Sequence, residues 1–395
     1  MRYSVPMGPD TSCLVHWCLR DAPRLTHPQA LLSGFAEQCV AVGVPVHRIM
    51  VTLRTLHPQL AAVGWTYEAG RDFKAEEYRV RDAMSEDYAA SPIRLLRERQ
   101  MTRLHVPLRG EHLHRFPVAR DLHARGFTDY LALSLVVGAD AEDGGERRHF
   151  ASLATQAPQG FSPACIALLE GAMAAFGLLL DRFALQMVAR NVCDTYIGRN
   201  TGRRVLAGQI RRGAIDTVHA AVWFSDLRGF TRRTQALGVS GTVELLNQWF
   251  DVVGAAVTAE GGEILKFIGD AALVIFPVDE RGAADACARA LRGAQQTLRG
   301  VADLDTPDGE PLRFGVGLTL GEVAYGNIGA ADRLDFTVIG HTVNVASRLE
   351  GLCGKLDEAV LTSHEFAHTI ADAMRPVGEH PLKGVSAPVA VFAPA

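Results

Sequence analysis

Two aspartates stand where apolar runs, typical of buried strands, come to an end. Asp226 ends the run of residues 219–226, and Gly229 then turns the chain into a helix. Asp270 lies inside residues 261–276, where two apolar runs flank a Gly-Asp pair in the pattern of a β-hairpin. We expect the hairpin to stand beside the first strand, so that the two carboxylates meet. Such a pair suits Mg²⁺ when phosphate oxygens complete its coordination, and two ions can hold the attacking and leaving oxygens of a displacement at phosphorus.

A second candidate element is the helix that begins near Thr342. Asn344 and Arg348 are four residues apart and therefore share one face, while Val345 and Leu349, together with Leu352, define the face expected to be buried. A planar guanidinium presents forked donors to phosphate oxygens. The alternative is a solvated Asn/Arg pair on a surface helix, just as either aspartate alone could be a solvated residue at a strand end.

Together these segments resemble the catalytic domain of class III nucleotidyl cyclases, the family of most adenylate and guanylate cyclases. The resemblance covers residues 215–393, and residues 342–348 match the family motif closely. It implies a reaction in which the 3′-hydroxyl attacks the α-phosphate and pyrophosphate leaves, with two Mg²⁺ or Mn²⁺ ions per active site. The implied roles are metal binding by Asp226, Asp270 and the Leu227 carbonyl, ribose orientation by Asn344, and transition-state stabilisation by Arg348.

The resemblance also implies which residues bind the substrate. A lysine on the hairpin with a threonine at the second position, here Lys266 and Thr337, is similar to the threonine-type adenylate cyclases, so ATP is the expected substrate. Lys383 matches the family's lysine for the triphosphate tail. Phe230 and Thr231 begin a helix whose backbone N–H groups can bind phosphates. The order strand, helix, hairpin, helix, strand matches a ferredoxin-like βαββαβ core.

Both halves of the expected site are present in one chain. Family geometry places the metal-binding residues of one subunit opposite the Asn and Arg of another, so a homodimer with two equivalent sites is implied. Three alternatives are a guanylate cyclase, a catalytically weak homologue that only binds nucleotide, and a diguanylate cyclase. The weak homologue should have lost an acid or the arginine, and neither is missing. Residues 261–263 suggest the diguanylate cyclase, but Ile264 stands where a second acid is required.

Composition limits the other possibilities. The chain has 395 residues and a net charge of −4, so it lacks the broad basic field typical of binding to nucleic acid or an anionic membrane. We see no signal peptide, and the most apolar stretch, residues 171–180, is too short to span a bilayer. Seven cysteines without a CxxC pair indicate reduced thiols and a cytoplasmic protein.

The predicted fold class is α/β (α+β), with a sensor module ahead of the cyclase domain. The expected segments are a loose arm (1–27), a GAF-like sensor domain (28–162), a coiled-coil helix with its connector (163–214) and the cyclase domain (215–395). Expected strands are 46–56, 61–67, 104–108, 129–137 and 149–155, with a helical stretch at 70–103. The GAF resemblance rests on this order and on residues 160–163. Four histidines, at positions 105, 112, 114 and 123, fit no metal motif, and the small-molecule ligand stays unknown.

The helix after Pro163 carries apolar residues at alternating three- and four-residue steps. That seam predicts a coiled coil between two helices, although a single helix packed on its own domain would show the same pattern. The seam ends where residues 190–214 become rich in Gly and Arg, so this segment is a hypothetical transmission element. The seam residues are Ile166, Leu169, Met173, Phe176, Leu180, Phe183 and Met187.

Overall fold

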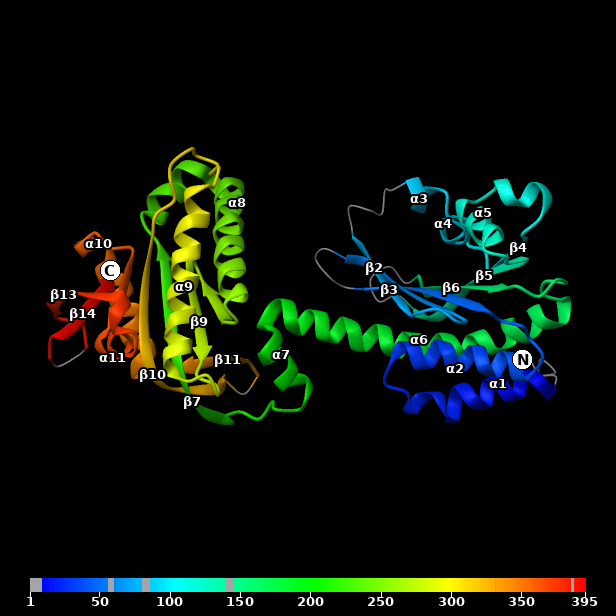
Figure 1. Cartoon of the computed structure of the whole chain (residues 1–395), viewed down its shortest axis with the longest axis horizontal. Helices are drawn as coiled ribbons and strands as arrows, with labels where there is room; N and C mark the ends of the chain where they lie inside the picture. Colours follow the sequence, from blue (N-terminus) through cyan, green and yellow to red (C-terminus); the bar gives the residue numbers. More distant parts are fainter. Residues whose placement is uncertain (1–8, 56–59, 80–85, 140–144, 331, 385–386) are drawn as a thin grey trace. The chain divides into compact units, whose positions relative to one another are not determined.

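The computed structural model describes residues 9–55, 60–79, 86–139, 145–330, 332–384 and 387–395. The chain divides into two compact units, Met1–Val192 and Cys193–Ala395. Each unit has its own sheet and its own apolar core (Figure 1).

The first unit is built on a six-stranded antiparallel sheet in the order β3-β2-β1-β6-β5-β4. Strand β5 alternates its side chains between two cores, with Leu131 and Leu133 on one face and Tyr130 and Ala132 on the other. The strands are β1 (Arg48–Arg54), β2 (Leu60–Glu68), β3 (Lys74–Arg79), β4 (Arg103–Pro107), β5 (Asp129–Ala139) and β6 (Glu146–Thr155).

Helices cover both faces of this sheet. Figure 1 shows α1, α2 and α6 along one face and α4 and α5 along the other. Phe35 of α2 stacks on Phe176 of α6 with ring centroids 4.1 Å apart, which joins the two helices over the sheet. The helices are α1 (Pro9–Arg20), η1 (Ala22–Arg24), α2 (Pro28–Ala41), α3 (Glu86–Ala89), α4 (Pro92–Glu98), η3 (Gly110–His114), α5 (Pro117–Ala124) and α6 (Pro163–Ile197).

Two expectations for this unit need correction. Residues 9–27 are not a loose arm, because α1 inserts Leu14 and Cys18 into the core, where both are fully buried. The stretch 70–103 is not wholly helical, since it contributes β3, an exposed polar strand at the edge of the sheet. Neither face of this exposed edge strand packs against a core, so its sequence lacks the alternation of apolar and polar residues by which a strand is predicted. Residues 1–8 lie outside the described part.

The predicted coiled-coil seam on α6 is also wrong. From Ile166 to Phe183 its residues are buried in the core of their own unit, and Met187 packs against the same core. They therefore cannot contact another copy. Among the described helices, α6 is long and apolar enough to cross a membrane by length and composition, and half of its most apolar window is buried inside the protein.

The second unit is built on an eight-stranded sheet. Strands β10-β7-β9-β8 lie side by side and are all antiparallel, which is the arrangement of a βαββαβ core, and β12, β14, β13 and β11 extend it. The strands are β7 (Ile215–Leu227), β8 (Glu263–Ile268), β9 (Ala271–Pro277), β10 (Phe314–Gly329), β11 (Leu334–Ile339), β12 (Val360–Ser363), β13 (Met374–His380) and β14 (Val389–Pro394).

Helices α8 and α9 pack on one face of this sheet, where Trp223 and Trp249 are fully buried. Helix α10 packs on the other face and lies directly on β10 at Gly317. A Cβ at Gly317 would come within 2.0 Å of the Ala346 carbonyl oxygen, so only glycine permits this contact. The helices are α7 (Arg199–Leu206), α8 (Phe230–Ala259), α9 (Ala283–Ala302), α10 (His341–Leu356), α11 (His364–Thr369) and η4 (Ala371–Ala373).

Candidate functional site

The structure brings the two predicted aspartates together. Asp226 is the penultimate residue of β7, and Asp270 occupies the turn between β8 and β9, the strand that pairs with β7. Burial raises the pKa of Asp226 to about 7, and a hydrogen bond with the Asp270 carboxyl and its charge act in the same direction. The indole Nε1 of Trp249 donates to the Asp270 carbonyl at 2.9 Å, which holds the turn against α8. The two carboxyl groups therefore meet at the edge of the sheet where β7 ends and the β8–β9 turn lies.

Sequence reasoning missed a third acid at this edge. Glu350 lies on α10, and burial raises its pKa to about 7; the guanidinium of Arg228 opposes that shift, and the charge of Asp270 adds to it. A Cβ at Gly315 of β10 would lie 2.7 Å from Oε1 of Glu350, so glycine leaves the room that this carboxyl occupies. The sequence offered no signal for this role: the position of Glu350 two residues after Arg348 places it on another face of the helix and says nothing of the two aspartates.

The raised pKa of Asp226 predicts a pH-dependent effect on stability. Because its folded-state pKa lies above 3.8, its contribution to stability is full below that pH and is lost as pH rises to about 7. In metal-free protein, Asp226→Asn should therefore raise Tm by about 2–4 °C at about pH 8 and leave it unchanged at about pH 3, below the ordinary pKa of an aspartate. Thermal denaturation in EDTA measures this, with Asp251→Asn on the exposed side of α8 as control. An equal shift at both pH values would contradict the expectation.

The proposed base-reading residues lie on β8 and β11, two strands that contact each other without pairing in the sheet. Lys266 Nζ is 3.2 Å from Oδ2 of Asp335, so the strands are joined by an ion pair that sequence reasoning did not anticipate. Thr337, two residues further along β11, is 6 % exposed, and its hydroxyl has no hydrogen-bond partner among the described residues. An unsatisfied buried hydroxyl is costly, which favours a site that a polar ligand completes.

Asn344 and Arg348 lie on the solvent-facing side of α10. Both are exposed, and in the part of the chain that the structure describes neither side chain has a hydrogen-bond or ion-pair partner. Val345 and Leu349 are buried on the opposite side, and Leu352 is partly buried, as the four-residue spacing predicted. The two polar side chains are thus available to a ligand or to another chain.

The remaining predicted residues occupy three positions. Phe230 and Thr231 are the first residues of α8, after Gly229 with φ 70° in the left-handed region. The first N–H groups of a helix lack intrahelical partners, so these amides can receive an anion near the acids. Leu227 follows Asp226 directly, and its amide donates to Oδ1 of that residue at 3.1 Å. Lys383 is exposed between β13 and β14 and contacts no other predicted site residue among the described ones.

The groups near Asp226 and Asp270 that could bind a metal ion all offer oxygen atoms. The facing carboxylates of Asp226 and Asp270, with the adjacent Leu227 carbonyl, fit a hard divalent cation such as Mg²⁺ or Mn²⁺. The described residues contain no group of three or more His, Cys, Asp or Glu side chains arranged around a metal position. The other ligands would therefore be backbone, water or substrate oxygens.

Residues 214–387 match the family model for the adenylate and guanylate cyclase catalytic domain. An uncharacterized protein of Mycobacterium tuberculosis is 35% identical over 182 residues, which are 45% of this chain and 33% of that protein. Adenylate cyclase 1 of Rhizobium meliloti is 33% identical over 175 residues, 43% of this chain and 26% of that protein. The chain thus spans about a third or less of the length of these curated relatives.

Among solved structures, the adenylyl cyclase CyaB from P. aeruginosa is 31% identical and has a TM-score of 0.39; the match covers 46% of this chain and 95% of that one. The guanylyl cyclase Cya2 is 31% identical with a TM-score of 0.40, covering 46% of this chain and 93% of that one. The C-terminal part of the chain is a class III adenylate/guanylate cyclase catalytic domain. The matching family model covers adenylate and guanylate cyclases alike, so the comparisons do not decide between ATP and GTP as the substrate.

Proposed function

We propose that the protein is an adenylate cyclase that converts ATP to 3′,5′-cyclic AMP and pyrophosphate. The observation that carries the proposal is the contact between Asp226 and Asp270 at the edge of the sheet, close to the first turn of α8. Carboxylates that face each other across neighbouring strands store repulsion that a bound divalent cation relieves. Such an arrangement is expected of a phosphoryl-transfer site rather than of a domain that has lost its chemistry.

Each residue has a separate task in this mechanism. Asp226, Asp270 and the Leu227 carbonyl would hold two Mg²⁺ or Mn²⁺ ions, which would neutralise phosphate charge and favour ionisation of the attacking 3′-hydroxyl. The amides of Phe230 and Thr231 bind phosphate oxygens at the start of α8, and Lys383 is assigned to the triphosphate tail. Asn344 orients the ribose, and Arg348 donates to the charge that develops on the α-phosphate.

Base choice is assigned to Lys266 and Thr337. Adenine presents a ring-nitrogen acceptor beside an amine donor, which complements an ammonium donor beside a hydroxyl acceptor. The ion pair with Asp335 supports this assignment, because it restricts the flexible Lys266 side chain. The unpartnered Thr337 hydroxyl supports it as well.

The Lys266→Glu variant tests this assignment. Reversing the charge removes the donor to adenine, so the ratio of kcat/KM for ATP over GTP should fall by at least about tenfold, the effect of one charged hydrogen bond. Rates of cyclic AMP and cyclic GMP formation measure the ratio. Lys355→Glu, an exposed lysine at the end of α10, is the matched control. An unchanged ratio in Lys266→Glu would remove the base-reading role.

A homodimer completes the proposed site. Asn344 and Arg348 are exposed and unpartnered in the described structure, and Phe267, Ile268 and Ile339 leave apolar surface exposed on β8 and β11. A second copy that covers this surface would bring its Arg348 to the acids. On α6, the pairing surface would be an exposed apolar stripe at seven-residue steps rather than the buried seam. This stripe consists of Leu178, Leu185 and Val192.

Regulation by the N-terminal unit is the second part of the proposal. Its antiparallel sheet flanked by helices supports the GAF-like assignment, and α6 leads from it toward the catalytic unit. Asn200 and Thr201 of α7 hydrogen-bond the buried Glu263, the first residue of the strand that carries Lys266. A displacement of α7 would therefore move β8, the strand that carries Lys266.

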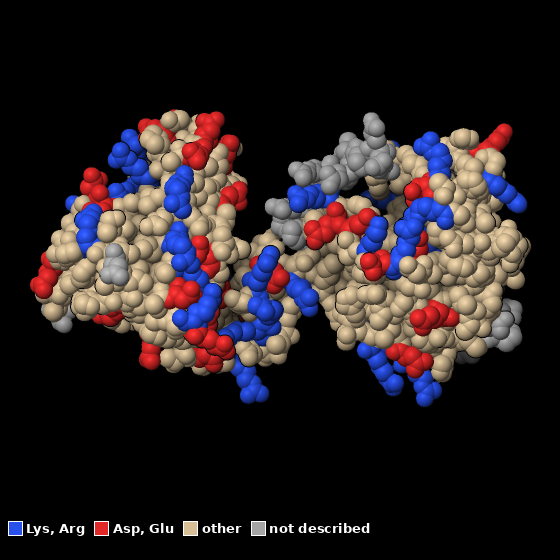
Figure 2. Space-filling model, viewed as in Figure 1, with Lys and Arg blue, Asp and Glu red and all other residues tan. Residues whose placement is uncertain are grey.

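The charges on the surface and the state of the cysteines bear on the proposed partners and location of the protein. On the face shown in Figure 2, basic and acidic side chains are interspersed over the described surface of each unit, which supports the absence of a nucleic-acid site. None of the seven cysteines forms a disulfide, as expected in the cytoplasm, where ATP is available.

An assay of the purified chain with ATP and GTP, each with Mg²⁺ and with Mn²⁺, tests the proposed function. We expect metal-dependent formation of cyclic AMP that exceeds formation of cyclic GMP. Cyclic GMP as the main product would overturn the base assignment alone. Nucleotide binding without either product would overturn the enzymatic proposal.

A further inference from the structure

A groove in the first unit lies at the end of the sheet, next to the start of α6. It has a volume of about 450 Å³, within the range of small-molecule sites. Three segments line it: the end of β4 with Arg109, the segment that joins α5 to β5, and residues 158–161. The space between the sheet and helices α4 and α5 is instead filled by an apolar core that includes Leu122 and Phe127. The groove therefore lies beside this core, and Phe127 belongs to both.

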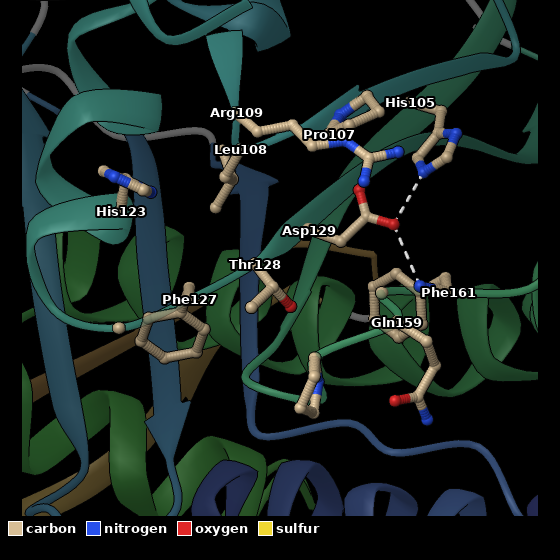
Figure 3. Close-up of a pocket in the computed structure, with 13 residues that line it drawn as sticks. His105, Pro107, Leu108, Arg109, His123, Phe127, Thr128, Asp129, Gln159 and Phe161 are labelled. Atoms are coloured by element: carbon tan, nitrogen blue, oxygen red, sulfur yellow. Dashed lines mark hydrogen bonds and ion pairs between the residues drawn. The ribbon is translucent and has the colours of Figure 1, made fainter.

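Asp129 is the fixed polar group of the groove. It is 4 % exposed, and its Oδ2 accepts from His105 Nε2 at 2.8 Å and from the Phe161 amide at 2.9 Å (Figure 3). Its Oδ1 accepts from the Tyr130 amide at 2.9 Å. Gly160, with φ +71°, lets the loop approach so closely that a Cβ there would lie 2.7 Å from Oδ2. Because both carboxylate oxygens already accept hydrogen bonds, Asp129 organises the groove and is a poor ligand for a cation.

The polar groups that stay free are mainly donors. In the described part of the chain, the Arg109 guanidinium has no ion-pair or hydrogen-bond partner, and neither has the His123 ring. Gln159 adds a side-chain amide to the same lining. The Thr128 hydroxyl is already used, since it donates to the carbonyls of Ala157 and Thr155 at 2.6 and 3.1 Å. The Arg109 guanidinium is unpaired, and the Asp129 carboxylate already accepts hydrogen bonds on both oxygens. The groove therefore favours an anion, such as a carboxylate or phosphate, whose oxygens can accept two hydrogen bonds from the guanidinium.

We propose that this groove binds a small metabolite through a carboxylate or phosphate group, with Arg109 as the principal contact. The volume admits such a group together with a short carbon skeleton, and Pro107 and Phe161 supply apolar lining. This site lies in the first unit and does not depend on the cyclase reaction.

The groove also touches the segment that sets the start of α6. Phe161 donates its amide to Asp129 and buries its ring (4 % exposed) in the core shared with α6. The next residue, Ser162, caps α6 by accepting from the Cys165 amide at 3.2 Å. A ligand held between Arg109 and Gln159 would therefore restrain the loop that anchors this helix.

Hydrogen–deuterium exchange of the full chain tests the site, with malonate and inorganic phosphate as separate probes. We expect saturable protection of residues 105–111 and 156–165 by at least one probe below about 20 mM, at ionic strength matched with sodium chloride. The stronger probe distinguishes a carboxylate from a phosphate ligand. Protection confined to the second unit, or none with either probe, would overturn the proposal.

The Arg109→Gln variant provides the residue-level test. It removes one charged hydrogen-bond donor, so the affinity for the effective probe should fall about tenfold or more, while Arg120→Gln, an exposed arginine on α5 outside the groove lining, should bind as the parent does. Because Arg109 is exposed and unpartnered, the variant should keep the Tm of the parent. Equal affinity in Arg109→Gln and Arg120→Gln would overturn the assignment of Arg109.

Discussion

Replacement of Arg348 by alanine should lower turnover about 10²–10³-fold, the scale for losing one preorganised donor to the transition state. The side chain is exposed on α10 and has no partner in the described structure, so its loss should leave Tm and the apolar face of the helix unchanged. Steady-state kinetics should show a fall in kcat with a smaller change in KM, because the contact forms as charge develops. Arg299→Ala, an exposed arginine at the end of α9, is the matched control.

A mixing experiment extends this prediction to the dimer. If acids and arginine come from different copies, inactive Arg348→Ala and inactive Asp226→Asn chains should restore about a quarter of parental activity when mixed, since half of the dimers carry one intact site of two. No restored activity, despite exchange of subunits, would show that each site is built within one chain. Near-parental turnover by Arg348→Ala alone would remove this residue from the mechanism.

Replacement of Asp226 by asparagine should abolish metal-dependent turnover while leaving the fold intact. Asparagine keeps the shape of the protonated acid but removes the charge that would bind the cation, and the residue lies at the end of β7 rather than in the apolar core. Calorimetric titration with Mn²⁺ in the presence of a non-hydrolysable nucleotide should show affinity reduced by at least about tenfold.

Two further variants make the metal prediction specific. Asp251→Asn, an exposed acid on α8, should bind Mn²⁺ and turn over as the parent does. Glu350→Gln, which neutralises the third acid, should weaken metal binding less than Asp226→Asn, because Glu350 acts on Asp226 and Asp270 through its charge alone. Retained turnover in Asp226→Asn would count against the metal site, and with it against the proposed reaction.

Local pattern was sufficient for the elements of the catalytic unit. The apolar runs on either side of Asp270 predicted the β8–β9 hairpin, and the spacing of Asn344 and Arg348 predicted which face of α10 is exposed. These features depend on residues close in sequence, whose periodicity reports directly on a strand or a helix. The pairing of Asp226 with Asp270 was predicted for the same reason, since a hairpin packed beside the first strand brings its turn to that strand's end.

Tertiary packing decided what the periodicity on α6 means. An a/d seam is compatible with another helix or with a sheet, because both accept an apolar stripe, and here the sheet and α2 of the same unit bury it. Likewise, nothing in the sequence around Asp335 or Glu350 indicated that one pairs with Lys266 and the other stands beside the acid pair. Those contacts join positions far apart in the chain. Sequence alone therefore determined the local elements and the candidate chemistry, and only the folded chain decided which faces are covered and which charges meet.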